Sequence, residues 1–253
     1  HTGAQCSVKP ILMGSARSAC PPPRPRSMTL TYFGHSTFQI ETDGTTLLFD
    51  PFFEDNPHTE VTPDELSPDV ILVSHAHFDH YADVGAFAGP GGPLVISNFE
   101  IITRVGEDYD HEHVHPLNEG GAVDFDWGRV EGVHARHTSS FPDGSYGGVA
   151  GGFVLELDDA TVYYTGDTAP FAEMEWIGDA YDVDVMLAPV GDVVTMGIDG
   201  ALQAADMVEP TTVIPVHYNT FPFIEVDLDE IEAAIEEAGF NAEVLDVGAT
   251  VDV

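Results

Sequence analysis

The residues best suited to chemistry fall in one short stretch, S-H-A-H-F-D-H, that ends at position 80. Four side chains of the metal-ligand type occur within six consecutive residues: His75, His77, Asp79 and His80. Neutral imidazole and carboxylate groups suit zinc and its borderline neighbours. The stretch follows an apolar run at residues 70–73 that is typical of a buried strand. A histidine-rich surface turn needs neither this strand nor this spacing, so the stretch predicts a metal-binding loop at a sheet edge.

Three later side chains have the same relation to a predicted strand. His137 follows residues 130–136, Asp167 follows residues 161–164, and His217 comes just after a third strand. Each is ordinary on its own, because a single histidine after a strand more often forms a hydrogen bond or faces solvent. Loops that start from rigid strands at one edge of a sheet can converge, so together these residues are predicted to complete the site.

Other histidines compete for the same role. Strand periodicity puts His134 and His137 on opposite faces, so at most one of them should point at the metal. His111, His113 and His115 alternate and suggest a second metal site. We interpret them as ordinary strand histidines, since no carboxylate or cysteine stands at a convincing spacing.

The elements that must position these residues follow from apolar periodicity and turn signals. Strands are predicted at residues 29–33, 37–41, 45–49, 70–73, 94–97, 113–115, 122–125, 130–136, 152–157, 161–164, 183–187, 212–215, 242–245 and 250–253. Helices are predicted at residues 62–66, 81–88, 99–105, 171–178, 199–208 and 228–238. Two packed sheets with helices on both outer faces fit this order, which is an α+β four-layer αββα sandwich.

The charge of the chain is extreme and uneven. The 253 residues include 44 acidic and 7 basic ones, a net charge of −37, and 43% are hydrophobic. Residues 28–253 hold all 44 acids and three bases, a net charge of −41. Such a chain repels itself unless salt screens it, so the composition indicates a salt-adapted cytoplasm, as in halophiles. Few cations also argue against nucleic-acid binding, and no apolar run is long enough for a membrane span.

Residues 1–27 differ from the rest in composition. They contain four basic residues, no acidic one, both cysteines and a proline-rich run. We expect a disordered tail, a remnant of cloning or a misassigned start, followed by one folded domain at residues 28–253. With both cysteines in this segment, no disulfide framework is expected in the domain.

Taken in order, the motifs resemble those of the metallo-β-lactamase superfamily: Gly34-His35-Ser36, Asp50-Pro51, the H-x-H-x-D-H loop, His137, Gly166-Asp167-Thr168 and His217. Within it, Gly191-Asp192, Thr195-Met196-Gly197 and the run H-Y-N-T-F-P at 217–222 resemble an uncharacterised metal-dependent hydrolase family near the L-ascorbate-6-phosphate lactonases. The resemblance covers about residues 28–253. It is specific for the fold and the metal site and weak for the substrate. Thr138 departs from it, because serine is expected there.

The resemblance implies a dinuclear centre with two sets of ligands. His75, His77 and His137 would bind one metal, and Asp79, His80 and His217 the other. Asp167 would bridge the two metal ions, which are expected to be zinc, with manganese or iron as alternatives.

Three further residues are expected around the ligands. Asp50 would fix the tautomer of a ligand histidine by a hydrogen bond, and Asn219 is placed behind the ligands as well. His35 is expected near the mouth of the site, where it would assist Asp79 in catalysis. The alternative for His35 is a buried histidine that only bonds to the backbone.

The expected reaction is hydrolysis. Two cations lower the pKa of a shared water from about 15.7 toward ~7, and the bridging hydroxide would attack a carbonyl or phosphorus while Asp79 transfers the proton. The bond attacked would be an ester, lactone, amide, thioester or phosphoester. No Ser–His–Asp or Cys–His site competes, because residues 28–253 contain no cysteine and no G-x-S-x-G motif.

The basic residues bear on the substrate. Only Arg104, Arg129 and Arg136 occur in residues 28–253, and only Arg136 neighbours a ligand. Phosphate groups usually bind to several Arg or Lys, although helix N-termini also hold them. A neutral or singly charged ester, lactone or amide is therefore favoured over the alternative, a sugar-phosphate lactone. A small-molecule substrate is expected, with no nucleic-acid or membrane partner, and self-association is left open.

Two other functions stay open on this fold. An iron-dependent oxidoreductase is one, although such enzymes usually carry a flavin domain for which no length is left. A non-catalytic metal-binding module is the other, although it would normally have lost ligands. Bound iron with oxygen consumption would favour the oxidoreductase. Turnover that stays unchanged in Asp167→Ala would favour the non-catalytic module.

Overall fold

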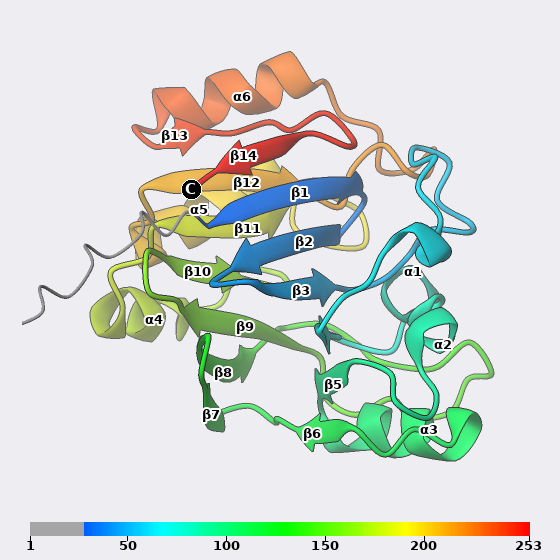
Figure 1. The fold of residues 1–253 in the computed structure, drawn as a ribbon. Helices are drawn as coiled ribbons and strands as arrows, with labels where there is room; N and C mark the ends of the chain where they lie inside the picture. The colour runs from blue at the N-terminus through cyan, green and yellow to red at the C-terminus, as the bar shows by residue number, and fades with distance from the viewer. Residues whose placement is uncertain (1–27) are drawn as a thin grey trace, which may run out of the picture.

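The computed structural model describes residues 28–253, and the predictions for residues 1–27 lie outside this range. Two seven-stranded sheets face each other, and helices cover their outer faces (Figure 1). Each sheet mixes parallel and antiparallel neighbours. This confirms the predicted four-layer αββα sandwich, which is the metallo-β-lactamase fold.

The first sheet has the strand order β14-β1-β2-β3-β4-β5-β6. Its strands are β1 (Thr29–Gly34), β2 (Thr37–Thr42), β3 (Thr45–Phe49), β4 (Val70–Leu72), β5 (Leu94–Ser97), β6 (Val114–Pro116) and β14 (Thr250–Asp252). The four strands from β3 to β6 run parallel, so β3 and β4 end at the same edge.

The second sheet has the order β13-β12-β11-β10-β9-β8-β7. Its strands are β7 (Ala122–Phe125), β8 (Gly128–His134), β9 (Gly151–Glu156), β10 (Thr161–Tyr164), β11 (Val185–Pro189), β12 (Thr212–Val216) and β13 (Asn241–Ala242). β10, β11 and β12 are parallel, and β8 points the same way because β9 is antiparallel to both β8 and β10. The strands that precede His137, Asp167 and His217 therefore all end at one edge.

Helices flank both sheets. They are α1 (Phe78–Tyr81), α2 (Val84–Phe87), α3 (Phe99–Tyr109), α4 (Met174–Ala180), α5 (Ile198–Val208) and α6 (Leu228–Glu237), with a single 3₁₀ turn at Pro63–Glu65. In Figure 1, α6 lies beyond β13 and β12 at the top, whereas α2 and α3 lie beside β5 and β6 at the lower right. The part of the chain that the structure describes has no helix long and apolar enough to cross a membrane.

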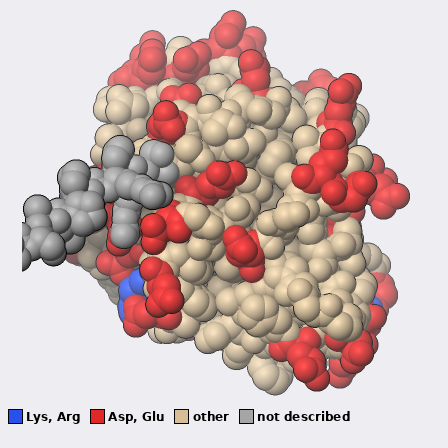
Figure 2. Space-filling view, viewed as in Figure 1, with Lys and Arg blue, Asp and Glu red and all other residues tan. Residues whose placement is uncertain are grey.

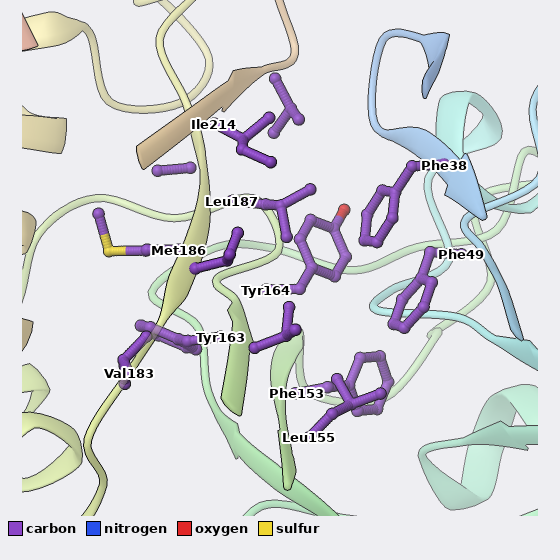
Figure 3. Close-up of a cluster of buried hydrophobic side chains, with 14 of the residues drawn as sticks. Phe38, Phe49, Phe153, Leu155, Tyr163, Tyr164, Val183, Met186, Leu187 and Ile214 are labelled. Carbon is purple, nitrogen blue, oxygen red and sulfur yellow. The ribbon is translucent and has the colours of Figure 1, made fainter. Parts of the chain in front are cut away.

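Strand periodicity sorts the apolar side chains into two cores. In β3, Leu47 and Phe49 point between the sheets, whereas Leu48 points outward to the helices. Phe38 and Phe49 stack at 4.3 Å between ring centroids, and the edge of Tyr164 from the other sheet meets both rings (Figure 3). This packing joins the end of β10 to the end of β3 and so fixes how the two loop-bearing edges meet.

Several predicted elements have shifted ends, such as the helix at 99–105, which extends to Tyr109, and two differ more. The helix expected at residues 81–88 is interrupted at Asp83, because its Oδ2 accepts hydrogen bonds from the backbone N–H groups of Phe53 and Glu54. The strand expected at residues 242–245 is limited to Asn241–Ala242, after which only Glu243 N–H still bonds to β12.

The surface carries the charge. Figure 2 shows acidic side chains spread over the visible face, with basic ones only near its margin. Arg104 pairs with Asp108 and Asp143, and Arg129 lies within ion-pair distance of three carboxylates. Two of the three arginines within residues 28–253 are thus already paired with carboxylates of the protein itself.

Candidate metal centre

The seven predicted ligands come together at one edge of the sandwich. They lie in the segments after β4, β8, β10 and β12, the first strand from one sheet and the last three from the other, with Asp79 and His80 in the short helix α1. Their imidazole and carboxylate atoms form two adjoining groups, each within 4.8 Å, and Asp167 lies between them.

The first group consists of His75, His77 and His137. His75 Nε2 lies 2.9 Å from His77 Nδ1, and the His137 ring meets both rings edge-on at about 5 Å. His134 turns the other way, where its Nδ1 lies 3.2 Å from Glu119. His137 rather than His134 thus joins the group, but β8 ends at His134, so the loop after the strand and not strand alternation sets the direction of His137.

The second group consists of His35, Asp79, His80 and His217. Asp79 Oδ2 lies 3.1 Å from His35 Nε2 and 3.7 Å from His217 Nε2. The predicted ligands Asp79, His80 and His217 are therefore all present, and His35 stands beside them as a fourth group.

Asp167 joins the two groups through a single oxygen. Its Oδ2 lies 3.1 Å from His217 Nε2, 3.3 Å from His80 Nε2, 3.6 Å from His137 Nε2 and 3.8 Å from His75 Nε2. The side chain is buried, with 4% exposure. One carboxylate oxygen thus faces two imidazoles from each group, which is the position expected of a bridging ligand.

Asp50 holds two of the ligand histidines from behind. Its Oδ2 accepts hydrogen bonds from His80 Nδ1 at 2.8 Å, Ser74 Oγ at 2.5 Å and Tyr164 OH at 2.6 Å. Ser74 Oγ also lies 3.0 Å from His75 Nδ1. Because the Ser74 hydroxyl proton is given to Asp50, this oxygen accepts from His75 Nδ1–H. Both histidines therefore carry their proton on Nδ1 and present a free Nε2 to the site.

His35 is buried, with 1% exposure, rather than placed at the mouth. It uses side chains rather than the backbone: Nε2 meets Asp79 and Nδ1 lies 2.9 Å from Thr220 Oγ1. Since a carboxylate only accepts, the neutral ring gives its Nε2 proton to Asp79. Its Nδ1 is left as an acceptor beside the Thr220 hydroxyl, which also donates to the Tyr218 carbonyl at 3.2 Å. His35 thus fixes one oxygen of Asp79.

The loop after β12 is held in an unusual backbone shape. His217 and Asn219 both have positive φ, at +56° and +58°, a region that non-glycine residues seldom adopt. His217 N–H donates to the carbonyl of His35, and Asn219 Oδ1 accepts from Val226 N–H. His58, to which the sequence assigned no role, lies 2.6 Å from the Asn219 carbonyl through Nε2. Asn219 therefore shapes the loop that presents His217.

Burial and charge divide the histidines by pKa. Burial lowers the pKa of His75, His77 and His137, which keeps them neutral. Burial also lowers the pKa of His217, but the Asp167 carboxylate outweighs it and raises the pKa to about 9. The pKa of His80 shifts upward for the same reason, with help from Asp50. Without a metal ion, His80 and His217 therefore hold their protons, because both face the Asp167 carboxylate.

The carboxylates shift in the opposite sense. Burial alone would raise the pKa of Asp167 and Asp79, but the facing imidazoles lower both well below the usual range. Both groups stay ionised at any pH at which the protein is handled, so they remain able to bind a cation.

Several buried atoms lack a hydrogen bond. Among the described residues these include His80 Nε2, both ring nitrogens of His217 and Asp167 Oδ1. His80 Nε2 and His217 Nε2 lie close to Asp167, but neither pair is aligned as a hydrogen bond. Unpaired buried polar atoms are costly, and two of these, His80 Nε2 and His217 Nε2, lie 3.3 and 3.1 Å from the ionised Asp167 Oδ2. A set of imidazole nitrogens and carboxylate oxygens with no thiolate fits zinc, manganese or iron.

Reasoning from the sequence missed Ser74, Tyr164 and Thr220. Ser74 directly precedes His75, and this position was a usable signal. Tyr164 looks like an ordinary apolar strand residue, and nothing in a single sequence links it to Asp50 across the sandwich. His111, which the sequence left as a strand histidine, bonds to the backbone of Gly89 and Pro93 away from the site.

The comparisons with known proteins bear on the family and the fold. The family model described as "Beta-lactamase superfamily domain" matches residues 29–217. A UPF0173 metal-dependent hydrolase of Salinibacter ruber is 66% identical over 88% of this chain and 99% of its own length. A UPF0173 metal-dependent hydrolase of Methylacidiphilum infernorum is 42% identical over 83% of this chain and 93% of its own length. The solved structure of Igni18, a metallo hydrolase from Ignicoccus hospitalis, is 33% identical with a TM-score of 0.79, covering 90% of this chain and 98% of that one.

Proposed function

This chain belongs to the UPF0173 metal-dependent hydrolase family of the metallo-β-lactamase superfamily, and we propose that it hydrolyses an uncharged ester, lactone or amide at a centre of two divalent metal ions. A phosphoester, including a sugar-phosphate lactone, is the less favoured substrate. The observation that carries the proposal is the position of Asp167 Oδ2 between the two histidine groups.

The ligand roles follow from the grouping. His75, His77 and His137 would hold one ion, whereas Asp79, His80 and His217 would hold the second, with Asp167 shared. Zinc is the metal we favour, because the ligand atoms are nitrogens and oxygens and because hydrogen bonds to Asp50 and Ser74 fix the tautomers of His80 and His75. Metal ions so held supply an activated water and polarise the bond that it attacks.

The chain's own residues supply position and proton transfer. Asp50 keeps the free Nε2 of His75 and His80 directed at the site. His35 donates to Asp79 Oδ2 and limits how that carboxylate can turn. The Asp79 side chain has 13% exposure and reaches solvent more than Asp167 does, so we assign it the transfer of a proton to the leaving group.

The surrounding charge favours an uncharged substrate. Arg104 and Arg129 pair with surface carboxylates, and Arg136 lines an outer groove of about 900 Å³ with Phe171 and Trp176. None of the seven proposed ligands lines that groove. The described part of the chain thus offers no arginine or lysine directed at the centre, which a phosphorylated substrate would usually need.

Metal analysis followed by a substrate screen tests the proposal. Protein purified in high salt should contain about two divalent ions per chain and should hydrolyse one class among lactones, esters, amides and phosphodiesters. Asp167→Ala should abolish the turnover, whereas Asp206→Ala, which removes an exposed carboxylate of α5, should not change it. Bound iron with oxygen consumption would replace hydrolysis by oxidation, and unchanged turnover in Asp167→Ala would refute the assignment of Asp167.

A further inference from the structure

Four phenylalanines form a continuous array beside the metal centre. The ring centroids of Phe52 and Phe78 are 5.9 Å apart, those of Phe78 and Phe221 are 5.9 Å apart, and Phe221 and Phe223 stack at 5.6 Å. Phe52 and Phe221 also meet at 6.4 Å. We call these four residues the aromatic array. They come from three separate segments, so the fold rather than one local turn brings them together.

The array runs from the buried site to the surface. Both Phe52 and Phe221 contact the His35 ring, at 5.6 and 5.5 Å, and His35 in turn bonds to Asp79. At the other end Phe78 is 45% exposed and Phe223 is 54% exposed. Aromatic faces left open to water next to reactive groups are a feature of ligand sites, where they bury apolar parts of a ligand.

A second loop brings more apolar surface to the same region. A Cβ atom on Gly191 would come within 2.9 Å of Ile224 Cβ, so the loop after β11 packs against the segment that carries Phe223. In that loop Val193 is 70% exposed and has φ of +59°, which is an outlier for a β-branched residue. Strained backbone that presents an apolar side chain to solvent is more common at binding sites than elsewhere.

Charge favours an uncharged group over an anion as the ligand of this surface. The arginines of the described residues are paired at the surface or directed into the outer groove, and no lysine occurs after position 9. Asp79 adds negative charge at the inner end of the array. Aromatic faces bind planar apolar groups by burial and edge-to-face contact without any counter-charge.

We propose that the aromatic array is a substrate subsite that binds an uncharged aryl group attached to the bond that is hydrolysed. This inference rests on the proposed function, because it names the substrate class of the same site. Phe78 and Phe223 form its outer wall, and Phe221 places the aryl group beside His35 and Asp79.

Binding of two metal-chelating probes tests this without turnover. Acetohydroxamic acid and phenylacetohydroxamic acid share the chelating group and differ by one phenyl ring. Titration calorimetry of the metal-loaded protein should show about tenfold tighter binding of the phenyl compound, which corresponds to about 1.4 kcal/mol. In Phe223→Ala and Phe78→Ala this ratio should fall below about threefold.

Trp176→Ala is the matched control, because Trp176 is 69% exposed on α4 and lines the outer groove instead. It should keep the tenfold ratio. Equal binding of both probes by the unaltered protein, binding of neither, or a ratio that changes only in Trp176→Ala would each overturn the subsite. A tenfold ratio without hydrolysis of any screened substrate would leave the subsite standing and overturn the proposed reaction, so the two failures are distinguishable.

Discussion

Asp50→Asn is the sharpest test of how the protein sets up the centre. Asp50 is fully buried, and its Oδ1 accepts from Ser74 N–H while its Oδ2 accepts three more protons. An asparagine of the same shape has only one oxygen. If that oxygen stays on Ser74 N–H, the new NH₂ group faces the Nδ1–H of His80. The His80 ring must then move its proton to Nε2, the atom that should bind the metal.

The magnitude follows from the hydrogen bonds that the substitution removes. Removing a hydrogen-bond partner behind a metal ligand typically costs ten- to a hundredfold in metal affinity, which is about 1.4–2.8 kcal/mol. Asp50 bonds to His80 directly and to His75 through Ser74, and these two histidines lie in different groups. We therefore expect the upper end of this range, with weaker binding of both ions.

Competition with a chromophoric chelator at fixed pH and high salt measures the affinity. Asp83→Asn is the matched control: Asp83 is also buried, and its Oδ2 accepts from two backbone N–H groups without contacting a ligand. It should lower the melting temperature and leave metal affinity within about twofold. The metal affinity of Tyr164→Phe should lie between those of Asp50→Asn and Asp83→Asn, because this substitution removes one hydrogen-bond donor to Asp50 and keeps the charge of Asp50. Wild-type affinity for both ions in a folded Asp50→Asn protein would refute the tautomer argument.

Three further predictions concern one ligand, pH and salt. His137→Ala should remove about one metal equivalent and lower turnover by more than about 100-fold, whereas His134→Ala, at the end of β8, should retain both; equal effects would show that His137 was wrongly assigned as the ligand. In the metal-free protein, the pKa of His217 is raised from 6.5 to about 9, so its stabilising contribution is complete below pH 6.5 and is lost as the pH rises through 9. The melting temperature of the metal-free protein should therefore fall across that window and that of the metal-loaded protein should not, and a flat metal-free profile would contradict this. Lowering the salt lengthens the screening length from ~3 Å at 1 M to ~10 Å at 0.1 M, so the protein should unfold on dialysis into dilute buffer, and a salt-independent melting temperature would rule out salt adaptation.

Reasoning from the sequence located the strands well because their signal is local. Residues 45–49, 94–97, 122–125 and 161–164 were predicted with the bounds that the structure has. Each is a short apolar run closed by turn residues, which needs no tertiary information. The break at Asp83 could not be found in this way, because the bonds that cause it come from Phe53 and Glu54, about thirty residues earlier.

In the candidate site too, local sequence signals were predictive and long-range contacts were not. That the loops could converge follows from which strands end at one edge, whereas the two ligand sets and the bridging role of Asp167 came from the resemblance to the superfamily. The environment of each ligand was not predictable, because it depends on contacts across the sandwich. Tyr164 reaches Asp50 from the other sheet, and Phe221 reaches Phe78 across 143 positions of chain. For His35 the sequence left burial as an alternative to a place at the mouth, but the side chains around it, Thr220 and Phe52, were not predicted.

The acidic surface and the aromatic array together suggest how this protein selects its substrate. A net charge of −41 over residues 28–253 attracts metal cations to the centre and repels anions. Molar salt screens that field beyond a few ångströms, so it cannot select among uncharged molecules. Selection in high salt must then come from contacts at short range, and apolar burial is not screened by salt. The open faces of Phe78 and Phe223 supply such contacts beside Asp79. On this argument, affinity for an aryl probe should hold or increase as salt rises, whereas a subsite that relied on charge would lose affinity over the same range.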